Sequence, residues 1–486
     1  MPGESTKLES SSTRVVEEDL YEIRNKIYPR SVSGVFAQWR IAVVTLTQVL
    51  FYGLPWINWN GRQAVLFDLI QRKFYIFGLV LWPQDVIYLT LLLILSALGL
   101  FLFTAIAGRL FCGYACPQTV YTEIFMWIER KVEGDRIARI RLDGEDWPWS
   151  LRKFRLKITK HSLWIILSLW TGLTFIGYFT PIKSLGLAII TLSLGPWQLF
   201  WLFFYSFATW GNAGFLREQV CKYMCPYARF QSVMVDKDTY LVTYDVKRGE
   251  QRGGRSKNAD YKSMGLGDCL DCSICVQVCP TGIDIRDGLQ YMCIGCGACV
   301  DGCNQVMKKM NYPQGLIRYT SERSIEDGLS IEATRKHIFR PRIVIYSVVM
   351  VLLSAAFASS LYMRNPLRLD IMRDRGALAR EVNGGEIENV YRIQMMNASE
   401  HPMIVHLKVN GLVDPQILDS QGHPIDEITI RPTSNMMMPL KIRVNPEGVV
   451  PGTLPIHFEL TGQEIVDSSL SVDRHREEKT TFIFPR

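Results

Sequence analysis

The sequence predicts a multi-domain membrane protein with an α-helical transmembrane region of about five spans, a small cysteine-rich domain and a C-terminal β-sandwich. Three observations support this fold class. Several apolar runs reach about twenty residues without a charge, which is the length that crosses a bilayer. Eight of the twelve cysteines fall between residues 269 and 303, and from about Glu386 onward short stretches alternate apolar and polar residues. The 486 residues are enough for about three domains.

Five apolar segments are predicted to cross the membrane. They are roughly residues 40–59, 86–108, 162–180, a stretch within 185–210, and 343–363. Trp and Tyr gather at their ends, as expected of side chains that anchor a helix at the membrane surface. Buried core helices are a poor alternative for the second and fifth segments and a fairer one for the first and third. Residues 74–84 are too few to span, so we expect them to be interfacial or re-entrant.

The basic residues predict which helix ends face the cytoplasm. The connection 109–160 is rich in Arg and Lys, whereas the next connection has only Lys183. The positive-inside rule therefore places residues 1–39 and 211–342 in the cytoplasm. Residues 364–486 then lie outside a bacterial inner membrane, in the periplasm. Four arginines after the fifth span oppose this orientation, but it leaves every cysteine on the reducing side.

The N-terminal tail, residues 1–39, precedes four spans within residues 40–210. It is polar and charged, and its first dozen residues are expected to be disordered. The net charge of +7 falls mostly in loops near the membrane surface. Nucleic-acid binding is not expected, because no basic patch is interleaved with aromatic residues.

The eight clustered cysteines follow the spacing of bacterial ferredoxins twice. CLDCSICVQVCP is followed by CIGCGACVDGC, so each run reads Cys-x2-Cys-x2-Cys-x3-Cys. In such a run three cysteines bind one cubane and the fourth binds the other. We therefore expect a domain at about 260–312 with two 4Fe-4S clusters. One set of ligands is Cys269, Cys272, Cys275 and Cys303, and the other is Cys279, Cys293, Cys296 and Cys299. Zinc sites and disulfide frameworks match this pattern poorly.

The four remaining cysteines form two further pairs. Cys112 and Cys116 follow the second span, Cys221 and Cys225 follow the fourth, and both pairs read Cys-x3-Cys-Pro. Positions four apart share a helix face, and proline then ends or bends the helix. The repetition suggests an internal duplication that could bring four thiols together. Thiols at this spacing suit Cu(I), zinc or a redox-active dithiol, with Met224 as a further soft ligand. Inert buried cysteines are the alternative.

The last hundred or so residues predict an antiparallel β-sandwich of immunoglobulin type. Short alternating segments are separated by Asn-Gly, Pro-Glu-Gly and Thr-Gly turns. Six methionines in this region can bind Cu(I), but such residues more often fill a core. They are Met395, Met396, Met403, Met436, Met437 and Met438. No catalytic triad is visible, and His401 with His406 is a weak pair.

These features together resemble the CcoG family of cytochrome c oxidase accessory proteins, also called FixG or RdxA. The resemblance is carried by LFCGYACPQTVYTEIFMWIERKVEGDR, by CKYMCPYARFQSVMVDKDTYLVTYD and by the eight-cysteine run, and it extends from about Tyr28 to the end of the chain. Members of the family are membrane polyferredoxins with an immunoglobulin-like C-terminal domain.

The resemblance implies a cupric reductase, which reduces Cu(II) to Cu(I) for copper delivery during assembly of a cbb(3)-type cytochrome c oxidase. The ferredoxin cysteines would relay electrons, and Cys112, Cys116, Cys221 and Cys225 would hold or face the copper. Its implied partners are the membrane, a copper chaperone or transporter, the oxidase or its assembly factors, and an unidentified electron donor. A quinone-linked respiratory polyferredoxin and a non-enzymatic assembly scaffold are the alternatives.

Overall fold

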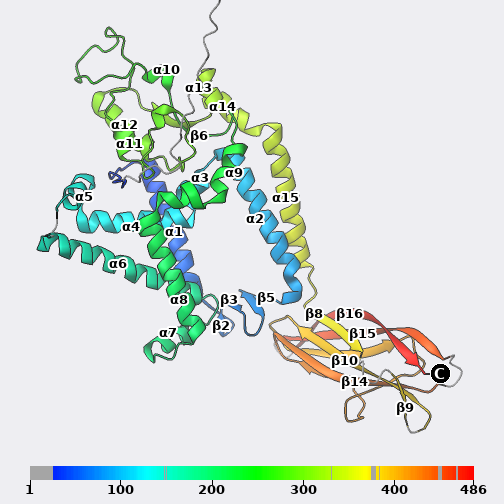
Figure 1. Cartoon of the computed structure of the whole chain (residues 1–486). Coiled ribbons are helices and arrows are strands. Elements are labelled where there is room, and N and C mark those ends of the chain that lie inside the picture. The colour runs from blue at the N-terminus through cyan, green and yellow to red at the C-terminus, as the bar shows by residue number, and fades with distance from the viewer. Residues whose placement is uncertain are drawn as a thin grey trace, which may run out of the picture.

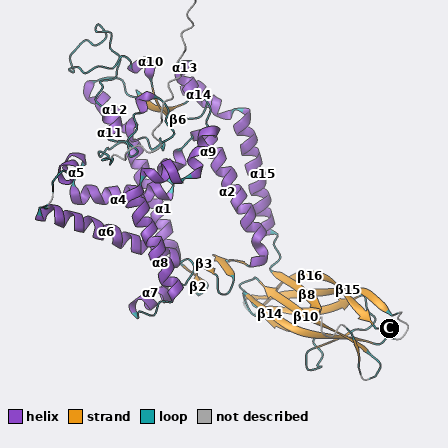
Figure 2. Ribbon diagram, viewed as in Figure 1, coloured by secondary structure: helices purple, strands orange, loops and turns teal. Residues whose placement is uncertain are grey.

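The computed structural model describes residues 26–146, 148, 150–329, 331–373, 379–382, 384–446, 451–466 and 469–485. The predicted disorder of the first dozen residues lies outside these described residues. Long helices occupy the middle of the molecule, with the cysteine-rich segment at one end and the β-sandwich at the other (Figure 1). Figure 2 shows the same separation, with most strands gathered at the sandwich end. The predicted multi-domain fold class is confirmed.

Within the described residues, three helices are long and apolar enough to cross a membrane. They are α1 (Val35–Gly53), α2 (Val86–Ala107) and α15 (Pro341–Tyr362). α2 and α15 lie side by side (Figure 1). Most of their apolar side chains are exposed on the protein surface. A helix that is apolar on all faces and unburied by protein is suited to a lipid environment.

The third and fourth predicted spans correspond to α6 (Leu151–Ile176) and α8 (Pro196–Thr209), joined through α7 (Ile182–Ile190). A Cβ at Gly172 would lie 2.8 Å from the carbonyl oxygen of Leu202, so this glycine lets α6 and α8 approach closely. α6 begins with several basic residues, and α8 has only 14 residues before π-helical turns begin at Trp210. The helices are therefore roughly consistent with five spans.

Short helices link these spans to the cysteine-rich segment. They are α3 (Leu110–Tyr114), α4 (Pro117–Glu133), α5 (Arg136–Asp143) and α9 (Pro226–Met234). The buried carboxylate of Glu129 lies 2.7 Å from Arg217 and 3.1 Å from Arg139. The Glu129 carboxylate thus pairs with both guanidinium groups. These ion pairs therefore fix α4 against α5 and against the turns that follow α8.

The cysteine-rich segment is closed by a two-stranded antiparallel sheet. Strand β6 (Leu241–Tyr244) pairs with β7 (Ile317–Thr320), and the eight ferredoxin cysteines lie between them in the sequence. Helices α11 (Ile274–Gln277) and α12 (Ala298–Met310) pack against each other at Gly302. Val242, Met307 and Ile317 form a core with several of the cysteines.

The C-terminal region is a β-sandwich of two antiparallel sheets, as predicted. One sheet contains β8 (Leu367–Arg373), β9 (Arg380–Glu381), β10 (Ile387–Asn397), β12 (Gln416–Leu418) and β14 (Ser434–Val444). The other contains β11 (Met403–Asn410), β13 (Ile428–Ile430), β15 (Gly452–Val466) and β16 (Ser469–Phe484). The sandwich begins at β8, which lies within the predicted domain 364–486 and before the alternating stretches noted from about Glu386.

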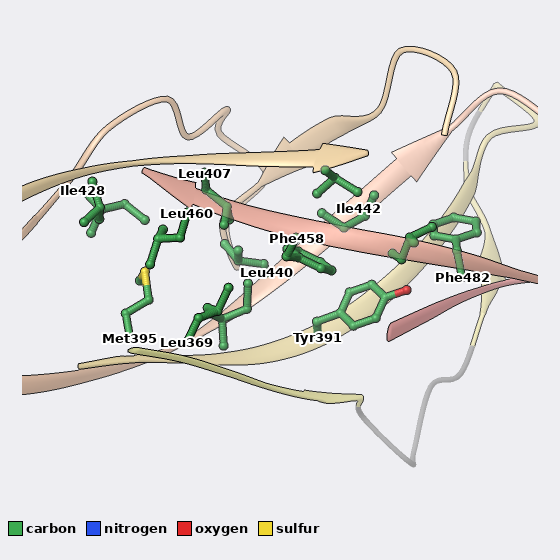
Figure 3. Packing of buried hydrophobic residues seen from close by; sticks show 14 of the residues in the cluster. Leu369, Tyr391, Met395, Leu407, Ile428, Leu440, Ile442, Phe458, Leu460 and Phe482 are labelled. Carbon is green, nitrogen blue, oxygen red and sulfur yellow. The ribbon is translucent and has the colours of Figure 1, made fainter. Parts of the chain in front are cut away.

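The sandwich core lies between the two sheets. Tyr391, Phe458 and Phe482 contribute large buried rings, and Leu440 packs beside them (Figure 3). Met395, Met396 and Met403 are buried as well, and Met436 and Met438 pack against the core, whereas Met437 is 56% exposed. Five of the six methionines that were candidate copper ligands therefore have a packing role in the sandwich core.

Residues 74–84, which the sequence predicted to be interfacial or re-entrant, form strands. They contribute to β4 (Lys73–Ile76) and β5 (Leu79–Leu81), which pair with β3 (Val65–Asp68) in a small sheet. This sheet lies at the sandwich end of the helices (Figure 1). Backbone pairing satisfies these polar groups better than an isolated loop in lipid would.

Ion pairs attach the sandwich to the membrane helices. Asp85, which precedes α2, is 3% exposed and lies 2.6 Å from Arg364. It also pairs with Arg368 of β8. Glu400 of the sandwich pairs with Arg62, in the connection between α1 and α2. The sandwich is therefore held by ion pairs at two places in the connection between α1 and α2, one at Arg62 and the other at Asp85.

We predict that Asp85→Ala loosens this attachment. Removal of one partner of a buried ion pair costs about 3–5 kcal/mol, because Arg364 stays buried without a counter-charge. The variant should unfold at a lower temperature in detergent and be cleaved sooner by protease after α15. Asp370→Ala, at an exposed carboxylate on β8, is the matched control and should behave like the wild type. Equal sensitivity of the two variants would contradict the prediction.

Candidate functional site

Four of the ferredoxin cysteines meet in one buried group, which we call the distal group. It consists of Cys269, Cys272, Cys275 and Cys303. Burial, together with the neighbouring thiols of Cys275, Cys269 and Cys272, raises the pKa of the Cys303 thiol to about 12. The structure therefore brings together the four residues predicted to share one cluster. Cys272 is exposed, whereas Cys269, Cys275 and Cys303 are buried.

The other four ferredoxin cysteines form a second group, which we call the proximal group. It consists of Cys279, Cys293, Cys296 and Cys299. Burial raises the pKa of the Cys299 thiol well above its usual value. The neighbouring thiols of Cys296, Cys293 and Cys279 also raise this pKa, by smaller amounts. Cys275 of the distal group also acts on Cys299. The two groups are therefore neighbours, as electron exchange between them requires.

Backbone amides point at the thiols of both groups. The N–H groups of Gly295 and Ala298 donate to the sulfurs of Cys293 and Cys296, and that of Ile317 donates to Cys303. Gly295 has φ +66°, a conformation that glycine adopts without strain. N–H donors to sulfur stabilise added negative charge on a cluster and so tune its potential.

The two groups fit cubane clusters better than single ions. No three or more Cys, His, Asp or Glu side chains among the described residues are placed to hold one metal ion. A cubane binds one thiolate at each iron corner and so keeps its four ligands farther apart than a lone ion does. Two groups of four soft thiols, all but Cys272 buried or partly buried and with amide donors beside them, are suited to two 4Fe-4S clusters.

The remaining four cysteines also converge, and we call them the four-thiol site. They are Cys112, Cys116, Cys221 and Cys225. The thiol of Cys221 lies within electrostatic range of the other three, and Cys112 lies within range of Cys116 and Cys225. The two Cys-x3-Cys-Pro pairs therefore lie near each other, although no three of their thiols are placed to hold one metal ion in the described residues. Met224 is 60% exposed and is not needed to complete this group.

Each proline of these pairs begins a helix. Cys116 is the N-cap of α4, with Pro117 at its first position, and Cys225 and Pro226 have the same places in α9. Proline suits a first helical turn because its missing N–H would have no partner there. The two cysteines of each pair therefore lie on either side of a helix boundary, not four apart on one continuous helix.

The four-thiol site lies directly against the proximal group. A Cβ at Gly113 would come within 2.9 Å of the Cα of Cys296 and 2.8 Å of the carbonyl oxygen of Ile294. The Tyr114 hydroxyl donates to the Cys296 carbonyl at 3.2 Å. Cys112 packs in one apolar group with Cys296 and Cys299. No side chain separates α3 from the proximal loop at Gly113.

Two residues beside these cysteines were not predicted to be functional. Gln231 of α9 is fully buried, and the Cys112 thiol donates to its Oε1 at 3.5 Å. Arg109 is the first residue of the basic connection 109–160, and its guanidinium donates to the carbonyl of Cys293 at 3.3 Å. No sequence pattern marks either residue, because both reach the cysteines only through long-range packing.

Three family models match this chain, two that describe iron–sulfur domains and one that describes the C-terminal sandwich. A 4Fe-4S dicluster domain model matches residues 216–322, and a 4Fe-4S binding domain model matches residues 89–133. A third model, described as an Ig-like fold at the C-terminus of FixG, matches residues 357–485. The two iron–sulfur matches include the proximal and distal groups and both pairs of the four-thiol site.

Similar proteins match over most of the chain. Protein RdxB of Cereibacter sphaeroides is 38% identical over 86% of this chain and 88% of its own length. Nitrogen fixation protein FixG of Rhizobium meliloti is 36% identical, with 81% and 80% covered. Ferredoxin-type protein NapH of Escherichia coli is 20% identical over 53% of this chain and 82% of its own length. The crystal structure of a FixG-related protein from Vibrio parahaemolyticus, 22% identical, covers 25% of this chain and 98% of its own, with a TM-score of 0.20.

We predict that Gly113→Ala disturbs the proximal group but not the distal one. The added methyl group meets backbone atoms, which cannot rotate away as a flexible side chain could. Iron per chain should fall by about half, with one cluster signal left in the EPR spectrum of the reduced protein. Gly186→Ala, in α7, is the matched control because its Cβ would contact nothing within 4 Å. Full iron in Gly113→Ala would show that this contact is not tight.

Proposed function

Because the chain belongs to the FixG family, with RdxA and RdxB among its relatives, we propose that this membrane iron–sulfur electron-transfer protein is a cupric reductase. In this proposal Cu(II) is the substrate, and it is reduced to Cu(I) at the four-thiol site. The Cu(I) then serves the assembly of a cbb(3)-type cytochrome c oxidase. The contact between Gly113 and the loop of Cys296 is the observation that supports this proposal most directly, since it joins a thiol-rich site to the proximal group.

The chemistry of the four-thiol site favours reduction of copper. Cu(I) prefers thiolate ligands, whereas Cu(II) prefers nitrogen and oxygen in tetragonal geometry. Four converging thiols therefore bind the product more strongly than the substrate, which raises the potential of the copper couple. The buried amide of Gln231, hydrogen-bonded to Cys112, holds one of these thiols in place. Each Cu(II) takes up one electron and becomes Cu(I).

The two groups of ferredoxin cysteines form a path to this site. When bound, a 4Fe-4S cluster in each group supplies one electron at a time. Cys272, exposed on the distal group, marks the side at which a donor can approach. Cys275 and Cys299 connect the distal group to the proximal group. Tyr114 and Gly113 then fix the proximal loop beside Cys112.

The charges near the helix ends support an orientation for this path. The helices α5 and α6 bring many Arg and Lys residues to the end at which the cysteines lie. By the positive-inside rule this end faces the cytoplasm, and the sandwich, residues 364–486, lies in the periplasm. In this arrangement a cytoplasmic donor, still unidentified, delivers electrons. A copper chaperone or transporter then takes the Cu(I), and the oxidase or its assembly factors meet the sandwich.

The similarity to ferredoxin-type protein NapH supports a second candidate function. It is a quinone-linked respiratory electron carrier, in which the same cysteine groups pass electrons to or from a quinone. NapH matches only about half of this chain, so it supports the electron path and not the sandwich. Cluster reduction by quinol, with no reaction toward Cu(II), would favour this candidate over the cupric reductase.

The central test mixes detergent-purified, dithionite-reduced and desalted protein anaerobically with Cu(II) in a stopped-flow instrument. We expect bleached iron–sulfur absorbance to return, with one Cu(I) captured by a chelating dye for each electron released. The double variant Cys116→Ser/Cys225→Ser should retain its iron but lose most of the rapid phase, since it lacks half of the four-thiol site. Slow or absent reoxidation in the wild type would contradict copper reduction, and equal rates in the variant would displace the copper site.

A further inference from the structure

Arg109 lies at the junction of the two cysteine sites. It follows α2 directly, precedes α3, and is only 9% exposed. Its Nη1 donates to the carbonyl of Cys293 at 3.3 Å, and its Nη2 donates to the carbonyl of Ala228 at 2.6 Å. Cys293 belongs to the proximal group, and Ala228 lies in α9 just after Cys225. The guanidinium therefore bridges the proximal loop and the helix that begins at the four-thiol site.

No carboxylate of the described chain forms an ion pair with Arg109, whose recorded side-chain hydrogen bonds end on carbonyls. A buried charge without a counter-charge is strongly unfavourable. The charge of Arg109 does act on the thiols of Cys293, Cys112 and Cys221. Sulfur ligands that carry negative charge therefore supply the compensation that no acid provides.

The distal group has a different electrostatic environment. Arg286 lies near Cys275, but it pairs with Asp284 at 2.5 Å and with Asp271 at 2.6 Å. Its charge is therefore neutralised by two acids. The proximal group has a second buried arginine, Arg40, which acts on Cys296 and lies 3.9 Å from Glu123. Glu123 opposes the effect of Arg40 on Cys296. At the distal group Arg255 donates to the carbonyl of Cys269 at 3.3 Å, but Arg255 is partly exposed, so solvent screens its charge. Among the described residues beside the two groups, the deeply buried charge without an acid partner is therefore that of Arg109.

We propose that Arg109 raises the reduction potential of the cluster on the proximal group above that of the cluster on the distal group. Reduction adds one negative charge to a cluster, and a fixed positive charge in a poorly hydrated site stabilises the reduced form. Electrons that enter at the distal group therefore collect next to the four-thiol site. Arg109 acts through the Cys293 loop, so it is a positioning residue. The inference rests on the cluster part of the proposed function and not on copper.

The test is an EPR-monitored redox titration of the full-length protein in detergent, with iron measured in each sample. The wild type should show two midpoint potentials. Arg109→Gln should lower the higher midpoint potential by at least about 59 mV, which is a tenfold change in the equilibrium constant of a one-electron reduction. The lower midpoint potential should not change. Arg109→Lys keeps the positive charge, so its higher midpoint potential should lie close to the wild-type value. Unchanged midpoints in Arg109→Gln protein with full iron would overturn the proposal.

Arg286→Gln is the matched control, because it removes the paired arginine of the distal group. It should lower the other midpoint and leave the higher one unchanged, so that the two arginines are assigned to different clusters. A shift of the same midpoint by both variants would overturn the assignment. Absence of two clusters in the wild type would contradict the proposed function itself.

If Arg109→Gln does not retain its iron, a second variant can still show which cluster has the higher midpoint potential. Cys272→Ser removes an exposed ligand of the distal group and leaves the proximal group intact. The one midpoint that remains should then be the higher of the two wild-type values. If the lower value remains, the distal cluster does not have the lower potential and the proposal is wrong.

Discussion

The backbone of α3 approaches the loop of Cys296 so closely at Gly113 that even a methyl group would collide with it. This contact holds together two parts of the chain that the sequence keeps far apart. Around it, Tyr114 and Arg109 donate to carbonyls of the same loop. Every chemical proposal for this protein depends on that distance, because electron exchange between two sites requires that they stay close.

A second contact prevents the cysteine-rich segment from moving as a separate body. The carboxylate of Asp301 in α12 accepts a hydrogen bond from the backbone N–H of Ala37 at 2.8 Å. This N–H belongs to the first turn of α1, where the helix dipole favours a negative charge. Phe36 stacks near Tyr319 and covers Gly297, whose φ of +71° and missing side chain leave room for the ring. The proximal group is therefore fixed to a membrane helix from two directions.

Charge is treated differently at the two ends of the molecule. At the sandwich end, Asp85 pairs with two arginines, Arg364 and Arg368, so each of them has an acid partner. Glu129 does the same for Arg139 and Arg217 beside α4. At Arg109 the protein leaves a buried positive charge without an acid among the described residues. Such an arrangement is stable only if negative charge resides on the neighbouring sulfurs, which links the fold to the redox state.

The sequence alone determined the features that depend on local spacing. Residue spacing along one stretch of chain predicted the two ferredoxin runs, the most apolar helices and the sandwich, because each is encoded in neighbouring residues. Only the tertiary structure decided that Cys112 and Cys221 lie near each other and that residues 74–84 pair as strands. It also decided that Arg109 lies between two cysteine sites, although it looked like any other loop charge. These features depend on which distant segments pack together, and packing of that kind leaves no periodic signal in a single sequence.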